Sequence, residues 1–375
     1  MRYYLSNQGN PLDKNHELWK KPLPASRQGD PLPDEGSPEK GLTYGQYFSA
    51  VKAFVESCPD LFTRVDDPSL DNVSVFLEKH GAFYHPSRIA IGRGSQVDEY
   101  VLNVAFSKPG RQYLENEYNT LKMLEDKYAY AFLPKVFACQ EIPTGTCGPV
   151  SMFLGEWFSA YHEFHVSDIT PDIPIGIRVW DYADKCVLLT TDQARSVYEQ
   201  ATMILTACYD IQTFEQISAW HHAAGDFVVN LDEQGRPHVK LVTVRRYSPL
   251  LNVTENSAEA VLNGLLLFLL NMSIRMRLDR LDGVKDVCWI DDVVVEGTLT
   301  GFFKGLELQL QNSRIPEGFC EYFKSFLAEI PAQEMLDLFV SLADSLPSDS
   351  PDLPIIQTHL ERHADAFFHQ IQTLI

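Results

Sequence analysis

The residues best suited to chemistry in this 375-residue chain lie in the stretch AWHHAAGDFVVN, residues 219–230. Two adjacent histidines, His221 and His222, precede the carboxylate of Asp226, and an apolar run follows. A neutral imidazole can accept a proton from a reacting hydroxyl, and imidazole with carboxylate is also a ligand set for zinc or iron. Small residues at 223–225 equally suit a tight turn whose histidines only hydrogen-bond carbonyl groups. The stretch therefore predicts either a catalytic or metal-binding loop or a structural turn.

The segments on either side of this loop would position it. Residues 190–210 have the apolar spacing of a long helix, and FVVN and VKLVTV predict a hairpin around LDEQGRPH. The rest of the chain has helical periodicity. We expect these helices around residues 256–280, 293–312, 316–329, 332–345 and 355–374.

The first half of the chain has a different pattern, in which two strand pairs flank a helix. The segments AFYHPSRIAI and EYVLNVAF are typical of strands joined by a turn, and LPKVFACQEI and VSMFLGEWF predict a second pair. A sheet-rich part followed by a helical part indicates an α+β fold. The order strand, strand, helix, strand, strand covers residues 82–91, 99–106, 107–127, 133–142 and 150–158.

Three further segments precede the strands. Residues 44–58 have helical spacing and stop before a proline. A shorter helix is expected after them, with Val73, Phe76 and Leu77 on one face. Residues 1–42 are rich in Pro, Gly and charged residues, which predicts an irregular N-terminal arm.

In this order and spacing the chain resembles the protein-kinase-like fold, in its aminoglycoside phosphotransferase and choline kinase branch. EYVLNVAF corresponds to the third strand, NEYNTLKML to helix C, and MFLGEWFSAYHEF to the hinge strand that meets the adenine. HHAAGDFVVN, the hairpin and VKLVTVR correspond to the catalytic loop and the metal-binding strand end. The resemblance implies two lobes: a small antiparallel-sheet N-lobe with preceding helices (43–158) and a larger helical C-lobe (159–375).

The resemblance also implies an activity. The family transfers a phosphoryl group from Mg-ATP, so ATP and Mg²⁺ are the expected cofactors and a hydroxyl- or amine-bearing small molecule is the expected substrate. The nucleotide would lie between the lobes, against Glu156, Trp157 and Phe158. His221 aligns with the catalytic aspartate and would be the base. Asp226 aligns with the magnesium-binding asparagine and would hold the metal.

Several charged residues of the family's site are replaced. Asn103 stands at the position of the lysine on the third strand, so Glu117, which matches the glutamate of helix C, would lack its partner. Thr243 occupies the position of a second metal-binding aspartate. With Asn103, Arg245 is the residue expected to contact phosphate in the lysine's stead. Because phosphoryl transfer depends on neutralising charge, a catalytically inactive binding or scaffold module of the same fold is the main alternative.

Two other functions fit the histidine pair. HHAAGD matches the H-H-x-x-x-D core of chloramphenicol acetyltransferase and condensation domains, which would make His222 the base of an acyl transfer. Phe227 stands where that motif has glycine, and a DFGWG-like second motif is absent from the sequence. A metal site is the third possibility, for which His162 and His165 offer another histidine pair.

Composition narrows the partners and the location. The net charge of -20 argues against a nucleic-acid or anionic-membrane surface, so we expect a nucleotide, a small-molecule substrate or a protein as partner. Seven cysteines without a C-x-x-C pair suit a reducing compartment, and the N-terminus lacks a signal-peptide core, so we expect a cytoplasmic protein. The longest apolar run, residues 261–274, is shorter than the roughly 20 residues of a membrane span and predicts a buried core helix.

Overall fold

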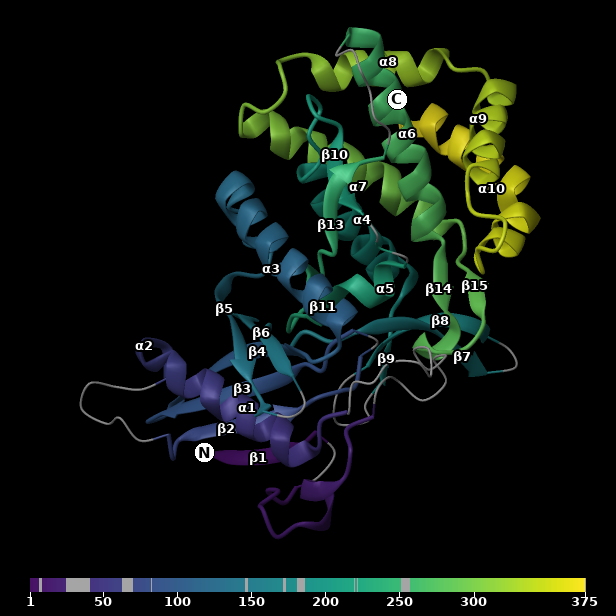
Figure 1. Cartoon of the computed structure of the whole chain (residues 1–375). Coiled ribbons are helices and arrows are strands. Elements are labelled where there is room, and N and C mark those ends of the chain that lie inside the picture. Colours follow the sequence, from purple (N-terminus) through teal and green to yellow (C-terminus); the bar gives the residue numbers. More distant parts are fainter. Residues whose placement is uncertain are drawn as a thin grey trace. The chain divides into compact units, whose positions relative to one another are not determined.

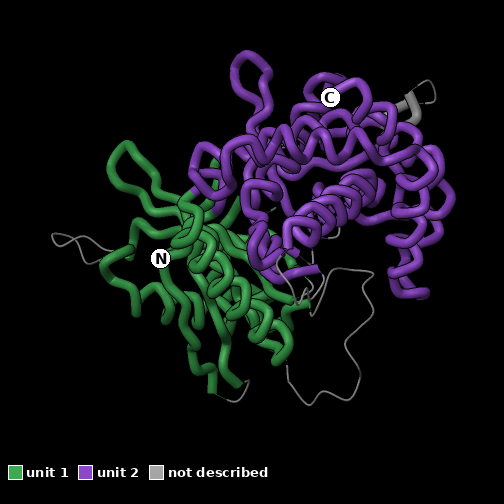
Figure 2. The backbone as a smooth tube through the Cα atoms, turned by 90° about the horizontal axis from the view of Figure 1, so that it is seen from above, with its two compact units in different colours: residues 1–129, 134–159 green, residues 130–133, 160–375 purple. Residues whose placement is uncertain are grey.

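The computed structural model places the described residues in two compact units (Figure 2). The smaller unit comprises residues 1–129 with 134–159, and the larger comprises residues 130–133 with 160–375. Helices and strands both contribute extensively, which confirms the expected α+β class. The structure describes residues 1–6, 9–24, 41–62, 70–81, 83–145, 148–170, 173–180, 186–218, 220, 222–250 and 257–374.

A six-stranded sheet lies at the centre of the smaller unit, in the order β1, β2, β3, β4, β6, β5 (Figure 1). β1 is parallel to β2, and the other neighbouring strands are antiparallel. The two strand pairs predicted from the sequence, β3–β4 and β5–β6, are confirmed. The strands are Arg2–Leu5 (β1), Val73–Leu77 (β2), Ser87–Arg93 (β3), Gln96–Ala105 (β4), Val136–Pro143 (β5) and Pro149–Glu156 (β6).

Two long helices pack against this sheet. Helix α1 (Tyr44–Ser57) buries its apolar side chains in one cluster with residues of β2, β3, β4 and β6, including Leu102 and Val104. Strand alternation therefore turns Asn103 to the opposite face. Helix α3 (Lys108–Tyr128) contacts β4, β5 and β6. The unit also contains the short helices η1 (Glu17–Lys20) and α2 (Pro59–Phe62).

The segment expected as a short helix after residue 71 is instead strand β2, so that prediction is wrong. Val73, Val75 and Leu77 are buried, which is the two-residue period of a strand rather than a helical face. Phe76 does not join them but stacks on Tyr4 of β1, with ring centroids 4.8 Å apart. Pairing with strands on both sides outweighs the local helical spacing.

The arm predicted to be irregular, residues 1–42, is partly built into the smaller unit. Its first residues form β1, and Leu12 and Leu23 are buried in the same cluster as α1. Residues 25–40 of the arm lie outside the described residues. A four-residue edge strand is too short to produce a periodic signal, and its pairing with β2 decides its structure.

The helices predicted for the larger unit are confirmed. Helix α6 contains the apolar run and is long and apolar enough to cross a membrane by length and composition, but 56% of its most apolar window is buried within the protein. This burial is typical of a core helix, as expected. The helices are α4 (Thr191–Ala207), α5 (Ala223–Asp226), α6 (Ala258–Met276), η3 (Leu281–Gly283), α7 (Val293–Gln311), α8 (Phe319–Glu329), α9 (Ala332–Asp344) and α10 (Leu353–Leu374).

The strands of the larger unit form several small sheets. The predicted hairpin is confirmed as β11–β12. Strand β10, which precedes this hairpin in the sequence, pairs with β13, which follows it. The three-stranded sheet β7–β8–β9 and the pair β14–β15 were not expected from the sequence. The strands are Phe164–Thr170 (β7), Ile173–Trp180 (β8), Cys186–Leu188 (β9), Glu215–Ser218 (β10), Phe227–Leu231 (β11), Pro237–Leu241 (β12), Arg246–Pro249 (β13), Leu278–Arg280 (β14) and Val287–Trp289 (β15).

Helices α4 and α7 pack with their backbones in close contact. Gly297, Gly301 and Gly305 recur every four residues along α7 and therefore share one face. A Cβ atom at Gly297 would lie 2.7 Å from the carbonyl oxygen of Arg195, and one at Gly301 would overlap the carbonyl group of Glu199. The stripe of glycines thus sets the distance between the two helices.

A buried arginine joins α6, α7 and α10. Arg277 donates from Nη1 to the carbonyl of Ile290 at 2.7 Å, from Nη2 to Asp292 at 2.7 Å, and from Nε to Nδ1 of His363 at 3.2 Å. Because arginine only donates, Nδ1 of His363 accepts, and its ring proton is on Nε2, 3.1 Å from Oγ of Ser273. Burial, and then Arg277, hold the pKa of His363 well below its usual value, so the ring is neutral.

Replacing Gly301 by alanine tests the close helix contact. Alanine in an open helix would stabilise by about 1 kcal/mol relative to glycine. Here we expect Gly301→Ala to destabilise by roughly 3 kcal/mol, because the added methyl group forces the two backbones apart. Urea denaturation followed by circular dichroism measures the change. The control is Gly41→Ala, where a Cβ would meet nothing within 4 Å; equal midpoints for the two variants would show that the contact does not constrain the helices.

Candidate functional site

The loop singled out by its histidines lies in the larger unit, between β10 and β11. Its last four residues form the single-turn helix α5, in which Ala223 and Ala224 are buried and Asp226 is only 2% exposed. The small side chains let the turn pack closely. His221, the expected catalytic base, lies outside the described residues.

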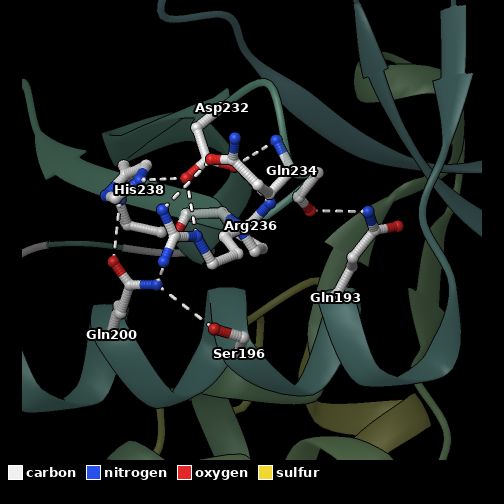
Figure 3. Close-up of polar contacts among 10 residues, drawn as sticks. Gln193, Ser196, Gln200, Asp232, Gln234, Arg236 and His238 are labelled. Carbon is white, nitrogen blue, oxygen red and sulfur yellow. Dashed lines mark hydrogen bonds and ion pairs between the residues drawn. The ribbon is translucent and has the colours of Figure 1, made fainter.

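Helix α4 holds the hairpin that follows this loop (Figure 3). Gln193 donates to the carbonyl of Gly235 at 2.7 Å, and Gln200 donates to the carbonyl of Pro237 at 2.7 Å. Gln200 also accepts from the backbone N–H of Val239 at 3.0 Å. Because Gln193 and Gln200 are seven residues apart, they lie on one face of α4 and bind successive parts of the hairpin.

The tip of the hairpin is closed by Asp232 (Figure 3). Its carboxylate accepts hydrogen bonds from the backbone N–H groups of Gln234 and Arg236 at 2.9 and 2.8 Å, and from Nε of Arg236 at 2.7 Å. The backbone hydrogen bond from Arg236 is the main cause that lowers the pKa of Asp232, and the arginine side chain adds to it. Gly235 supplies the left-handed φ of +75° that the turn requires.

The two ends of the hairpin bring Asp226 and Arg245 together. Nη1 of Arg245 lies 2.8 Å from Oδ1 and 3.0 Å from Oδ2 of Asp226. Next to this pair, the N–H of Val242 donates to the carbonyl of Asp226 at 2.8 Å. From the sequence we expected Asp226 to bind a metal ion and Arg245 to contact a phosphate, whereas in the structure the two side chains pair with each other. Thr243, the third candidate here, is half-buried between the buried Val244 and the half-buried Val242.

His222 faces a carboxylate from a distant part of the chain. It precedes α5, is half-buried, and has Nε2 3.6 Å from Oδ1 of Asp352. Asp352 is 8% exposed and immediately precedes α10. A carboxylate beside a histidine can orient the imidazole when the two come within hydrogen-bonding distance. The sequence offered no signal for Asp352, because the two residues meet only through the packing of α10.

The candidate residues of the smaller unit are also engaged locally. Asn103 lies on β4 opposite Phe153 of β6 and is 9% exposed. Glu117 on α3 is 2% exposed and accepts a hydrogen bond from the hydroxyl of Tyr84 at 2.6 Å. Glu117 was expected to lack its lysine partner, and Tyr84 supplies a hydrogen-bond donor there. Tyr84 was missed because nothing in its sequence surroundings points to α3.

The residues expected to contact an adenine lie where the last strand of the smaller unit's sheet ends. Glu156 donates its backbone N–H to the carbonyl of Lys135 at 2.8 Å, which extends the β5–β6 pairing by one residue. The ring of Trp157 lies 5.8 Å from the guanidinium of Arg88, which also pairs with Glu78 at 2.9 Å. The aromatic face of Trp157 therefore has a cation beside it.

The two residues of the second histidine pair have different partners. The backbone N–H of His162 donates to Val229 of β11 at 2.9 Å, whereas Nδ1 of His165 lies 3.3 Å from Oδ1 of Asp279. Burial alone would lower the pKa of His165, but hydrogen bonds with Asp279 and Glu163 raise it to about 9. Within the described residues, no three or more His, Cys, Asp or Glu side chains are grouped so that they could hold a metal ion.

No protein-family model matches the chain, and no curated protein matches it at a significant level.

Removing Arg245 tests how much the buried Asp226 depends on it. We expect Arg245→Met to lower the free energy of unfolding by about 3 kcal/mol, because it leaves a buried carboxylate without its cation. The double variant Asp226→Asn with Arg245→Met should recover most of this loss. Urea denaturation gives all the values, and Arg246→Met, at the exposed neighbour, is the matched control. If Arg245→Met were as mild as Arg246→Met, the pair would have no structural role.

The pKa of His165 predicts a pH-dependent stability. An unfolded histidine titrates near 6.5 and folded His165 near 9, so its stabilising contribution is full below about pH 6.5 and is lost as pH rises toward 9. NMR titration of the His165 ring should give a midpoint near 9 in the wild type and a lower one in Asp279→Asn. A wild-type midpoint at or below 6.5 would contradict the pairing.

Proposed function

We propose that this chain is a catalytically inactive binding module of the protein-kinase-like fold, related in architecture to the small-molecule phosphotransferases. In this proposal the positions of the transfer site are kept, but their side chains pair within the protein instead of holding Mg²⁺ and phosphate. The ligand would be a nucleotide, a small molecule or a protein.

The order of elements supports the choice of fold. In the smaller unit the chain runs β4, α3, β5, β6, which is the strand and helix order of the family from its third strand through helix C to the hinge. In the larger unit the loop before β11, the hairpin β11–β12 and the segment before β13 follow the order of the catalytic loop and the metal-binding strand end. Fold alone does not imply activity, so the side chains must decide the function.

The ion pair between Asp226 and Arg245 is the observation that carries the proposal. A metal-binding carboxylate must offer its oxygens to Mg²⁺, which prefers hard oxygen ligands in a near-octahedral shell. Both oxygens of Asp226 lie within 3.0 Å of the arginine, and the carboxylate is 2% exposed. Mg²⁺ would have to displace the guanidinium of Arg245 from this buried carboxylate.

Acyl transfer is a second candidate, favoured by His222 and Asp352. A carboxylate close to a histidine is one feature of a general-base site, and His222, with Asp352 3.6 Å away, lies in the H-H-x-x-x-D segment. In this case acetyl-coenzyme A should bind to the purified protein and ATP should not. The variant His222→Ala should then abolish transfer of the acetyl group, while its free energy of unfolding stays within about 0.5 kcal/mol of the wild-type value.

Calorimetric titration with ATP, with and without Mg²⁺, tests the main proposal. We expect magnesium to leave the affinity for ATP unchanged within about twofold, in the wild type and in Asp226→Asn alike, because Arg245 already neutralises the carboxylate. If Mg²⁺ tightened ATP binding tenfold or more, and Asp226→Asn removed that effect, the site would be a working Mg-ATP site. The inactive-module proposal would then be wrong.

A further inference from the structure

Two arginines at the end of α6 differ sharply in how many partners they have. Arg277, the first residue after the helix, is 1% exposed and donates from all three of its side-chain nitrogens to other groups of the protein. Arg275, in the last turn, is half-buried. Within the described residues its one side-chain hydrogen bond runs from Nε to Oδ1 of Asn271 at 3.2 Å. The two Nη groups of Arg275 therefore keep their donors for another partner.

The charge of Arg275 also lacks a close counter-ion. Across the part of the chain that the structure describes, no carboxylate oxygen lies within 4.0 Å of its guanidinium nitrogens. Burial lowers the pKa of Arg275, and the charge of Asp352 opposes this only in part. The negative end of the helix dipole favours a cation in the last turn, which lets the fold hold this charge. A cation partly removed from water is nevertheless costly until an anion pairs with it.

Asn271 fixes the direction of the Arg275 guanidinium. Because arginine only donates hydrogen bonds, the atom of Asn271 that meets Nε is the amide oxygen. Asn271 lies four residues before Arg275 on the same face of α6 and is also half-buried. The NH₂ group of this amide forms no hydrogen bond with any described residue. The end of α6 thus presents a forked cation with a neutral donor beside it.

We propose that the end of α6 binds the carboxylate of a small molecule, with the two Nη groups of Arg275 each donating a hydrogen bond to one carboxylate oxygen. A guanidinium fork and a carboxylate match in this geometry, and the charge on both partners strengthens the two hydrogen bonds.

The balance of charge favours a carboxylate over a phosphate. One negative charge compensates Arg275, whereas the second charge of a phosphate dianion would be repelled by the nearby Asp352. The inference goes beyond the proposed function and does not rest on it, because Arg275 holds none of the positions compared with a phosphotransferase. The effect of Mg²⁺ on ATP binding can therefore come out either way without deciding this site.

Sodium acetate is the probe for this site, and acetamide, which has nearly the same shape without the charge, is its neutral counterpart. Binding would be followed on the full-length protein, labelled with ¹⁵N-arginine, through the NMR signal of the Arg275 Nε–H group. This signal is identified by its loss in Arg275→Lys, and NaCl keeps the ionic strength constant. We expect acetate to shift the signal saturably with a dissociation constant on the order of 10 mM, as for one charge-assisted pair. Acetamide and phosphate should bind at least about tenfold more weakly.

Three variants separate the fork from the charge, with acetate binding followed through the backbone amide signals of the last turn of α6. Arg275→Lys keeps the charge but loses the fork, so binding should weaken roughly fivefold or more. Arg275→Gln should abolish binding and still fold, because it removes a half-buried charge that has no close carboxylate. Arg280→Gln, at an exposed arginine five residues further on, is the matched control and should bind acetate as the wild type does.

The proposal would be overturned if acetate left the Arg275 signal unchanged, or if acetamide or phosphate shifted it at the same concentrations as acetate. Undiminished acetate binding in Arg275→Gln would also overturn it. Should Arg275→Gln fail to fold, the comparison of the three probes on the wild type decides the outcome.

Discussion

The backbone contact between α4 and α7 is the constraint on which the organisation of the larger unit depends. Glycines on one face of α7 let the carbonyl groups of α4 approach closely, so α4 has one fixed position and rotation. The same helix also binds the hairpin, through the side chains of Gln193 and Gln200. The hairpin in turn carries the candidate site at its base. A displacement of α4 would therefore be transmitted directly to the ends of β11 and β12.

Local patterns in the sequence were sufficient for the elements with a long or regular signal. The 3.6-residue spacing located α4, α6, α7, α8, α9 and α10, and the turn LDEQGRPH located the hairpin because Asp and Gly at its tip have defined conformational roles. The alternating burial of a strand was mistaken for helical spacing in the short segment that forms β2. Phe76 looked like part of a helical face with Val73 and Leu77, whereas its packing on Tyr4 depends on a strand far away in the sequence. The same limit applies to β14 and β15, of three residues each.

The candidate site shows the same division between local and distant information. The segment with Asp226 and the segment with Arg245 were both identified from their types and from the hairpin between them. Their partnership was not, because a sequence does not reveal whether a cation at a strand end turns toward a ligand or toward a buried carboxylate. Tyr84 and Asp352 were missed for a related reason. Tyr84 reaches Glu117, and Asp352 reaches His222, only after whole helices have packed.

Each unit contains a buried carboxylate that is paired with a residue of the same unit. A buried carboxylate needs a hydrogen-bond donor or a cation beside it. Here Glu117 receives the hydroxyl of Tyr84 and Asp226 receives Arg245, in each case from within its own unit. A buried carboxylate with neither would cost on the order of several kcal/mol. The donor stands in another segment of the chain in each case, so each carboxylate joins two segments of its own unit.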